Sequence, residues 1–173
     1  MENNNPTITT LQNLLDDDAR KFTSAEILLI NSLPQWIKLA DSLQLKTVLK
    51  KYFDVLQDHV KKMESFIEAE KITSLSATNR VMHAFVEEIN EKLSNCTDPE
   101  IKDACLLSGI QAINHFKISM YGTAAAFANT LGMENQAALF HEAESGEKQI
   151  DDRLTQLAEY EINNRARNPI LLK

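Results

Sequence analysis

Apolar residues recur every three or four positions along four long stretches of this chain, and this spacing constrains the fold more than any other feature. One stretch runs through Leu106, Ile110, Ile113, Lys117, Met120, Ala124, Phe127 and Leu131. Side chains at that spacing share one face of an α-helix, and such a face packs against a core. Only four glycines and four prolines occur among the 173 residues, so few positions favour turns. The sequence therefore predicts an all-α fold of long helices.

Breaks in this pattern divide the chain into four long helices and one short helix. The long helices are expected at 7–40, 43–70, 99–131 and 134–164, with Pro34 as a kink or a restart in the first. Asp98 and Pro99 form a typical helix start, and Gly132 is a typical helix end. A short amphipathic helix is expected within 71–97, beginning at the polar segment 73–76. Residues 1–6 are expected to be a disordered tail, 7–165 a single domain, and 166–173 a C-terminal tail.

The connections predict how these helices are arranged. Short links join the first long helix to the second and the third to the fourth, so each pair should be an antiparallel hairpin. The link between the second and third long helices contains the short helix. This link is long enough to cross from one end of the bundle to the other. Two hairpins with such a crossover form a ferritin-like four-helix bundle with a short extra helix. An up-and-down bundle with an extra packed helix is the alternative.

Polar side chains interrupt the apolar stripe near the middle of each long helix. The predicted polar core layer consists of Glu26, His59, Asn114, Lys117, Glu147 and Asp151. A lone buried charge reduces folding stability by roughly several kcal/mol, so charges at such positions must face one another or bind an ion. The stripes therefore predict one polar layer at the waist of the bundle, where helical bundles build metal sites.

Charge and composition narrow the class of protein. The formal net charge of −7 argues against a nucleic-acid partner. No apolar run approaches the roughly 20 residues that a membrane-spanning helix needs, and no signal peptide is visible at the start. The two cysteines, Cys96 and Cys105, form no recognised metal or redox motif, which favours a reducing compartment. A soluble, cytoplasmic protein is expected.

Several segments together resemble the YciE/YciF-like family of bacterial ferritin-like, stress-associated proteins. They are Ser-Ala-Glu at 24–26, Asn-His-Phe-Lys-Ile-Ser-Met-Tyr-Gly-Thr at 114–123, Leu-Gly at 131–132, and Glu-Lys at 147–148 ahead of Asp151 and Leu-Thr at 154–155. The resemblance extends over about residues 8–158. It implies a ferritin-like bundle, a homodimer and a carboxylate cluster able to bind two metal ions.

This chain departs from the family pattern at the metal ligands. Where the family has glutamates, Asn114 and Lys117 stand in the third long helix, and Leu56 stands in the second. Residue-by-residue transfer leaves Glu26, His59, Glu147 and Asp151 as candidate metal ligands. Because an ammonium group has no lone pair to donate, Lys117 favours a metal-free layer with no cofactor.

Three functions are compatible with these residues. The first is a non-enzymatic, stress-associated protein whose metal site has degenerated into a charge network. The second is an iron or manganese carboxylate enzyme: a di-metal oxidase, peroxidase or catalase-like bundle, with a single bound metal as an intermediate case. The third is a binding module for a protein partner that the sequence does not identify. A homodimer is expected to use Trp36, Phe85 and the apolar tail at 170–172.

Overall fold

The computed structural model describes residues 8–69, 71 and 78–167, and the elements within these ranges are all helical. The five main helices are α1 (Leu11–Leu39), α2 (Leu43–Ala69), α3 (Arg80–Asn95), α4 (Pro99–Thr130) and α5 (Glu134–Leu157). A π-helical turn, η1 (Ala158–Ile162), and the short α6 (Asn163–Ala166) continue α5. Among the described helices, none has an apolar stretch long enough to cross a membrane.

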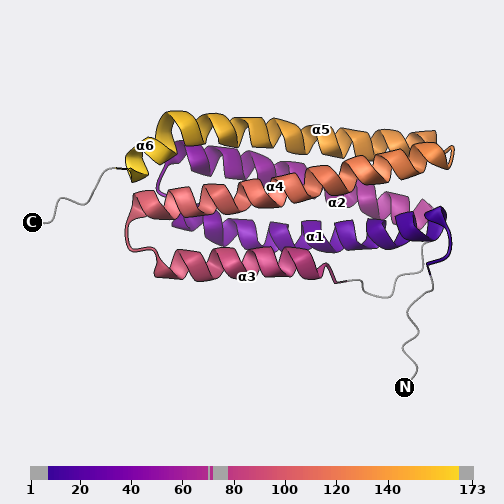
Figure 1. Cartoon of the computed structure of the whole chain (residues 1–173), viewed down its shortest axis with the longest axis horizontal. Coiled ribbons are helices and arrows are strands. Elements are labelled where there is room, and N and C mark those ends of the chain that lie inside the picture. The colour runs from indigo at the N-terminus through magenta and orange to yellow at the C-terminus, as the bar shows by residue number, and fades with distance from the viewer. Residues whose placement is uncertain (1–7, 70, 72–77, 168–173) are drawn as a thin grey trace, which may run out of the picture.

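The helices form the two hairpins and the crossover that the sequence predicts. In Figure 1, α1 and α5 run in one direction and α2 and α4 run in the other. Helix α3 runs back along the bundle between the end of α2 and the start of α4. It packs against α1 and α4. Since α2 and α4 are parallel, the up-and-down alternative is wrong.

The observed helix boundaries differ from the expected ones at three places. The expected start at 73–76 lies outside the described residues; α3 is instead capped by Asn79, whose side chain accepts a hydrogen bond from the Met82 N–H at 2.9 Å. Helix α1 continues through Pro34 without a restart. The last helix extends past 164, because η1 and α6 prolong it to Ala166.

The link between α4 and α5 turns at Gly132, as the sequence predicts. Its φ of 73° lies in the left-handed region, which glycine adopts at little cost. The Gly132 N–H donates to the Asn129 carbonyl at 3.1 Å, and the Met133 N–H donates to the Ala128 carbonyl at 2.9 Å. These bonds satisfy carbonyl groups at the end of α4, so the hairpin can be short.

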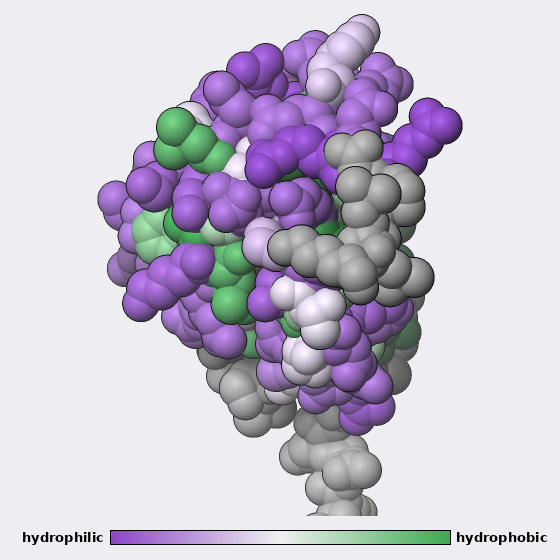
Figure 2. Space-filling model, turned by 90° about the vertical axis from the view of Figure 1, so that its left-hand side faces the viewer, coloured by the Kyte–Doolittle hydropathy of each residue, from purple (hydrophilic) through white to green (hydrophobic). Residues whose placement is uncertain are grey.

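The end of the bundle that carries the α1–α2 turn is mostly hydrophilic. Figure 2 views this end and shows apolar side chains scattered among polar ones. Leu43 at the start of α2 is 75% exposed, and Tyr160 in η1 is 79% exposed. Trp36, by contrast, is fully buried beneath this end, and its indole N–H donates to Asn90 Oδ1 at 2.8 Å. Trp36 therefore joins α1 to α3, and its assignment to a dimer contact is wrong.

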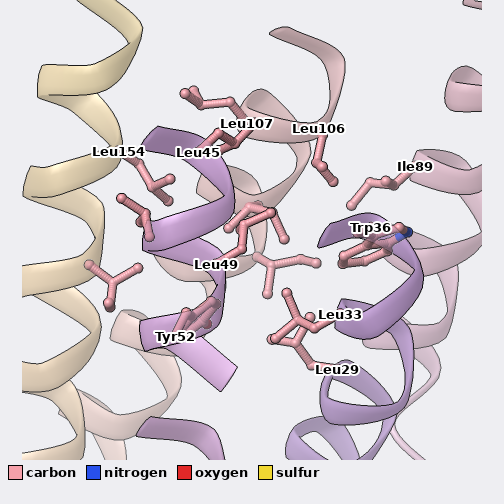
Figure 3. Packing of buried hydrophobic residues seen from close by; sticks show 14 of the residues in the cluster. Leu29, Leu33, Trp36, Leu45, Leu49, Tyr52, Ile89, Leu106, Leu107 and Leu154 are labelled. Carbon is pink, nitrogen blue, oxygen red and sulfur yellow. The ribbon is translucent and has the colours of Figure 1, made fainter. Parts of the chain in front are cut away.

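The core consists of two apolar clusters. The cluster nearer the α1–α2 turn is shown in Figure 3, where leucines and aromatic rings of α1 and α2 meet side chains of α3, α4 and α5. The second cluster contains Leu15 and Phe22 of α1, Phe66 of α2 and Phe140 of α5. Phe140 meets both Phe22 and Phe66 edge to face, with ring centroids 6.1 and 5.5 Å apart. The two clusters hold the four long helices together at both ends.

A buried carboxylate of α4 holds the α1–α2 turn. Asp103 is 1% exposed, and it accepts hydrogen bonds from the Asp41 N–H at 2.7 Å and the Ser42 N–H at 2.8 Å. The Ser42 hydroxyl accepts from the Leu45 N–H at 3.2 Å and donates to Glu161 Oε1 at 2.6 Å. The start of α2 is thus tied to both α4 and η1, which aligns the two hairpins.

Replacing Asp103 with alanine is expected to destabilise the bundle by about 1–3 kcal/mol, because the Asp41 and Ser42 N–H groups, the second of them buried, lose their acceptor. Urea unfolding followed by far-UV circular dichroism measures this change. Asp152→Ala at an exposed position of α5 is the matched control and should change the unfolding free energy by less than about 0.5 kcal/mol. Equal effects of the two variants would contradict the role given to Asp103.

Candidate functional site

Each of the four long helices contributes a polar side chain between the two apolar clusters. Glu26 lies between Phe22 and Leu29 along α1, and its neighbours on either side belong to different clusters. The same is true of His59 in α2, Lys117 in α4 and Glu147 in α5. These side chains are 0–6% exposed. The periodicity of the helices therefore brings them to one level, a buried charge layer at the waist of the bundle.

Lys117 lies at the centre of this layer. Its ammonium nitrogen Nζ donates to Glu26 Oε2 at 2.9 Å, to Glu147 Oε1 at 2.5 Å and to the Tyr52 hydroxyl at 3.1 Å. An ammonium group has three N–H donors, and each of them has an acceptor here. The cation is 1% exposed, so the two glutamates rather than water compensate its charge.

The remaining glutamate oxygens are also hydrogen-bonded. Glu26 Oε1 accepts from the Tyr121 hydroxyl. Glu147 Oε2 accepts from the Tyr52 hydroxyl at 2.7 Å and from Asn114 Nδ2 at 2.5 Å. Because every carboxylate oxygen has a donor, the two buried glutamates are stabilised by their surroundings without an added ion.

The pKa values of the two buried glutamates are shifted in opposite directions. Burial raises the pKa of Glu26, but the Lys117 ammonium, the adjacent His59 ring and the hydrogen bond from Tyr121 outweigh it, so the net shift is downward. Burial also raises the pKa of Glu147; Lys117 lowers it and Glu26 raises it further, and the net shift is upward. Burial and the nearby glutamates raise the pKa of Tyr52 and of Tyr121 well above their ordinary value. Glu26 is thus the more firmly ionised carboxylate, and both tyrosines act as neutral donors.

His59 lies at the edge of the layer. Its Nδ1 atom is 3.4 Å from Glu26 Oε1 and 3.7 Å from Glu147 Oε1, but it lacks an aligned hydrogen-bond partner among the described residues. The imidazole ring packs edge to face against Tyr121, with ring centroids 5.8 Å apart. A small pocket between α2 and α5 reaches the ring and is lined by His59, Lys62, Met63, Tyr121, Leu139, Glu142 and Ala143. His59 is therefore the member of the layer closest to solvent.

Asp151 does not join the layer, and its assignment there is wrong. Its carboxylate lies 3.3 Å from His115 Nε2, and its side chain is 15% exposed. Four residues make slightly more than one helical turn, so the step from Glu147 to Asp151 moves the side chain round α5 towards its edge. Sequence reasoning also left Tyr52 and Tyr121 out of the layer. Both stand on apolar stripes, where a tyrosine is read as a core residue, and only the tertiary contacts show that their hydroxyls point at glutamates.

The donor set does not fit a di-metal centre. Such centres in bundles take a carboxylate from each of two helices and a Glu-x-x-His pair from each of the other two. Within the described part of the chain, one group of three metal-binding side chains gathers: Glu26, His59 and Glu147, with ligand atoms within 4.8 Å of one another. Helix α4 supplies Lys117, whose ammonium occupies the space between the glutamates. Asn114 Oδ1 of α4 is buried and has no hydrogen-bond partner among the described residues.

Replacing Lys117 with methionine is expected to cost about 2–4 kcal/mol at neutral pH, because two buried carboxylates lose their counter-charge. Without the cation, burial raises the pKa of both glutamates, so the folded variant binds protons more tightly than the unfolded chain. Its stability deficit should therefore shrink as the pH falls from 7 towards about 4. Urea unfolding at several pH values measures the difference in unfolding free energy between this variant and the wild type. Lys148→Met, which removes an exposed lysine paired with Glu144, is the control. A deficit that is independent of pH would contradict the charge argument.

The sequence and the fold of this chain are similar to those of known proteins. Protein YciF of Escherichia coli K12 is 28% identical over 146 residues, which span 84% of this chain and 88% of YciF. The crystal structure of YciF, called a stress protein, matches with a TM-score of 0.82 and 27% identity, covering 93% of this chain and all of that one. YcfI of Rhodopseudomonas palustris matches with a TM-score of 0.83 over 87% of this chain and 96% of that chain; its 22% identity supports the fold alone.

The family assignment agrees with these similarities and confirms the resemblance to YciF. Residues 10–167 match the domain of unknown function DUF892. This range includes all five main helices and every residue of the charge layer. The chain belongs to the DUF892 family.

Proposed function

We propose that this protein is a non-enzymatic, stress-associated, ferritin-like protein in which a lysine has taken the place of metal. The observation that carries the proposal is the position of Lys117 Nζ, within 3.1 Å of Glu26, Glu147 and Tyr52. Its positive charge compensates the negative charges of the two glutamates, as a bound metal cation would. The similarity to E. coli YciF, which is called a stress protein, supports the stress-associated part of the proposal.

The missing ligands support the same proposal. Helix α2 has Leu56 one turn before His59, and α4 has Asn114 one turn before Lys117. Neither leucine nor an ammonium group can bind a metal ion, so two of the four helices lack the ligand pair that a di-metal centre needs. A catalytic metal also needs an open coordination position, and the tyrosine hydroxyls fill the space around the glutamates. The layer therefore serves as an internal charge network.

An iron or manganese carboxylate enzyme is the second candidate, and one observation favours it. Glu26, His59 and Glu147 bring three ligand atoms together, and His59 Nδ1 lacks an aligned partner among the described residues. A single divalent ion could bind there if the Lys117 side chain moved away. Such an ion would act as a Lewis acid or a redox centre, with His59 and the two glutamates as its ligands.

Metal binding separates the two candidates. Wild-type protein from cells grown with added iron and manganese is expected to hold far less than two metal ions per chain and to show no ferroxidase activity. Lys117→Glu should bind iron or manganese at least about tenfold more tightly, because it removes the competing cation and adds a carboxylate ligand. Elemental analysis and titration calorimetry measure these quantities.

Lys117→Met is the matched control, since it removes the cation without adding a ligand. It should bind metal more weakly than Lys117→Glu. Two tightly bound ions per chain in the wild-type protein, with iron oxidation that is lost in His59→Ala, would overturn the proposal and establish the enzyme instead.

A homodimer is proposed from the family resemblance. Trp36 is buried and cannot take part, and Phe85 packs beside Phe116 with ring centroids 5.7 Å apart. Leu43 at the start of α2 and Tyr160 in η1 are exposed apolar side chains, and the apolar tail at 170–172 lies outside the described residues. Light scattering at tens of micromolar is expected to give twice the chain mass of 19.6 kDa. A mass equal to that of one chain would contradict the dimer.

A further inference from the structure

The α3–α4 hairpin carries both cysteines of the chain. Cys96 is the residue that ends α3, with an extended backbone, and Cys105 lies in the second turn of α4. Both are free thiols and both are half-buried. The turn between the two helices consists of only a few residues, so the first turns of α4 must lie beside the last turns of α3.

The register of the hairpin places the two thiols opposite each other. Phe85 of α3 contacts Phe116 of α4, and eleven residues separate Phe85 from Cys96 and Cys105 from Phe116. Eleven residues make about three helical turns. Because α3 and α4 are antiparallel, three turns forward along α3 from Phe85 and three turns back along α4 from Phe116 bring the same helix faces together again, at Cys96 and Cys105. The helices approach closely in between: a Cβ on Gly109 would lie 2.5 Å from Ile89 Cγ1. Because Gly109 has no side chain, α3 and α4 can lie close together on this face.

The electrostatics agree with this register. Burial raises the pKa of the Cys105 thiol, the neighbouring Cys96 side chain raises it further, and Lys92 lowers it in part. Cys96 Sγ donates to the Lys92 carbonyl at 3.2 Å. Cys96 and Lys92 of α3 therefore both act on the Cys105 thiol of α4, which agrees with their positions at the end of the hairpin.

We propose that Cys96 and Cys105 form a reversible intramolecular disulfide that is made by reaction with a hydroperoxide. Half-burial lets a molecule as small as hydrogen peroxide reach the thiols, and the facing positions supply a resolving thiol for the one that reacts first. The bond would join α3 to α4 at the surface, away from the charge layer, so this inference does not depend on the proposed function.

The reaction proceeds in two steps. The Cys96 thiolate attacks one oxygen of the hydroperoxide, the O–O bond breaks, water or an alcohol leaves, and Cys96 becomes a sulfenic acid. The Cys105 thiolate then attacks Cys96 Sγ, a sulfur–sulfur bond forms, and hydroxide leaves as water with the proton that Cys105 released. The two sulfurs lose two electrons together, and the oxygen atoms of the hydroperoxide accept them. Burial disfavours ionisation of the Cys105 thiol, so Cys105 is assigned the second, resolving step.

Tryptic mapping tests this assignment, because Lys102 lies between the two cysteines. The full chain is treated with hydrogen peroxide, alkylated and digested without reduction. A linked peptide of 93–102 and 103–117 is expected, with loss of both free thiols and a decrease of about 2 Da in the mass of the intact chain. Dithiothreitol should restore both thiols.

Cys105→Ser and Cys96→Ser are the matched variants. In Cys105→Ser, a Cys96 sulfenic acid should persist and be trapped by dimedone, whereas Cys96→Ser should oxidise more slowly and form no linked peptide. The proposal is overturned if the wild-type thiols oxidise to separate sulfenic or sulfinic acids without a linked peptide. It is also overturned if the linkage forms only between chains, seen as a dimer on a non-reducing gel.

Discussion

A lysine ammonium held between two glutamates is the interaction on which the rest of this bundle depends. Lys117 brings together α1, α4 and α5 through Glu26 and Glu147, and Tyr52 adds α2. A buried ion pair adds little to stability compared with well-packed apolar side chains, but an unpaired member of it is costly. One alignment of the four helices gives every donor of the ammonium an acceptor. An alignment that separated these groups would leave a buried charge unpaired, so the charge layer favours the observed alignment.

Buried carboxylates at the waist of a helical bundle can be compensated in more than one way. A cluster of carboxylates in a dry layer needs positive charge, and either a metal ion or a lysine can supply it. In this chain the lysine comes from α4, and the tyrosine hydroxyls and Asn114 complete the coordination of the glutamate oxygens. His59 keeps one nitrogen towards Glu26 and lies beside the pocket between α2 and α5. The layer thus combines three side chains of metal-binding types, Glu26, His59 and Glu147, with the fixed cation of Lys117.

Outside the layer, single side chains hold the helices in place. Asp103 accepts the two N–H groups that open the α1–α2 turn, and Trp36 reaches Asn90 on the crossover helix α3. Gly109 lets α3 lie close against α4. The crossover helix is therefore part of the core rather than a linker, and the hairpin that it forms with α4 brings the two cysteines together.

The sequence alone determined the helices, their order and most of the charge layer. The apolar spacing around Lys117 and Glu147 predicted that both face the core, because residues three or four apart share a helix face. Gly132 and Pro99 marked helix ends for local steric reasons. Only the tertiary structure decided that Asp151 turns away, that Tyr52 and Tyr121 donate to the glutamates, and that Trp36 is internal. These outcomes depend on how far each helix is rotated and shifted against its neighbours, and periodicity along one helix does not contain that information.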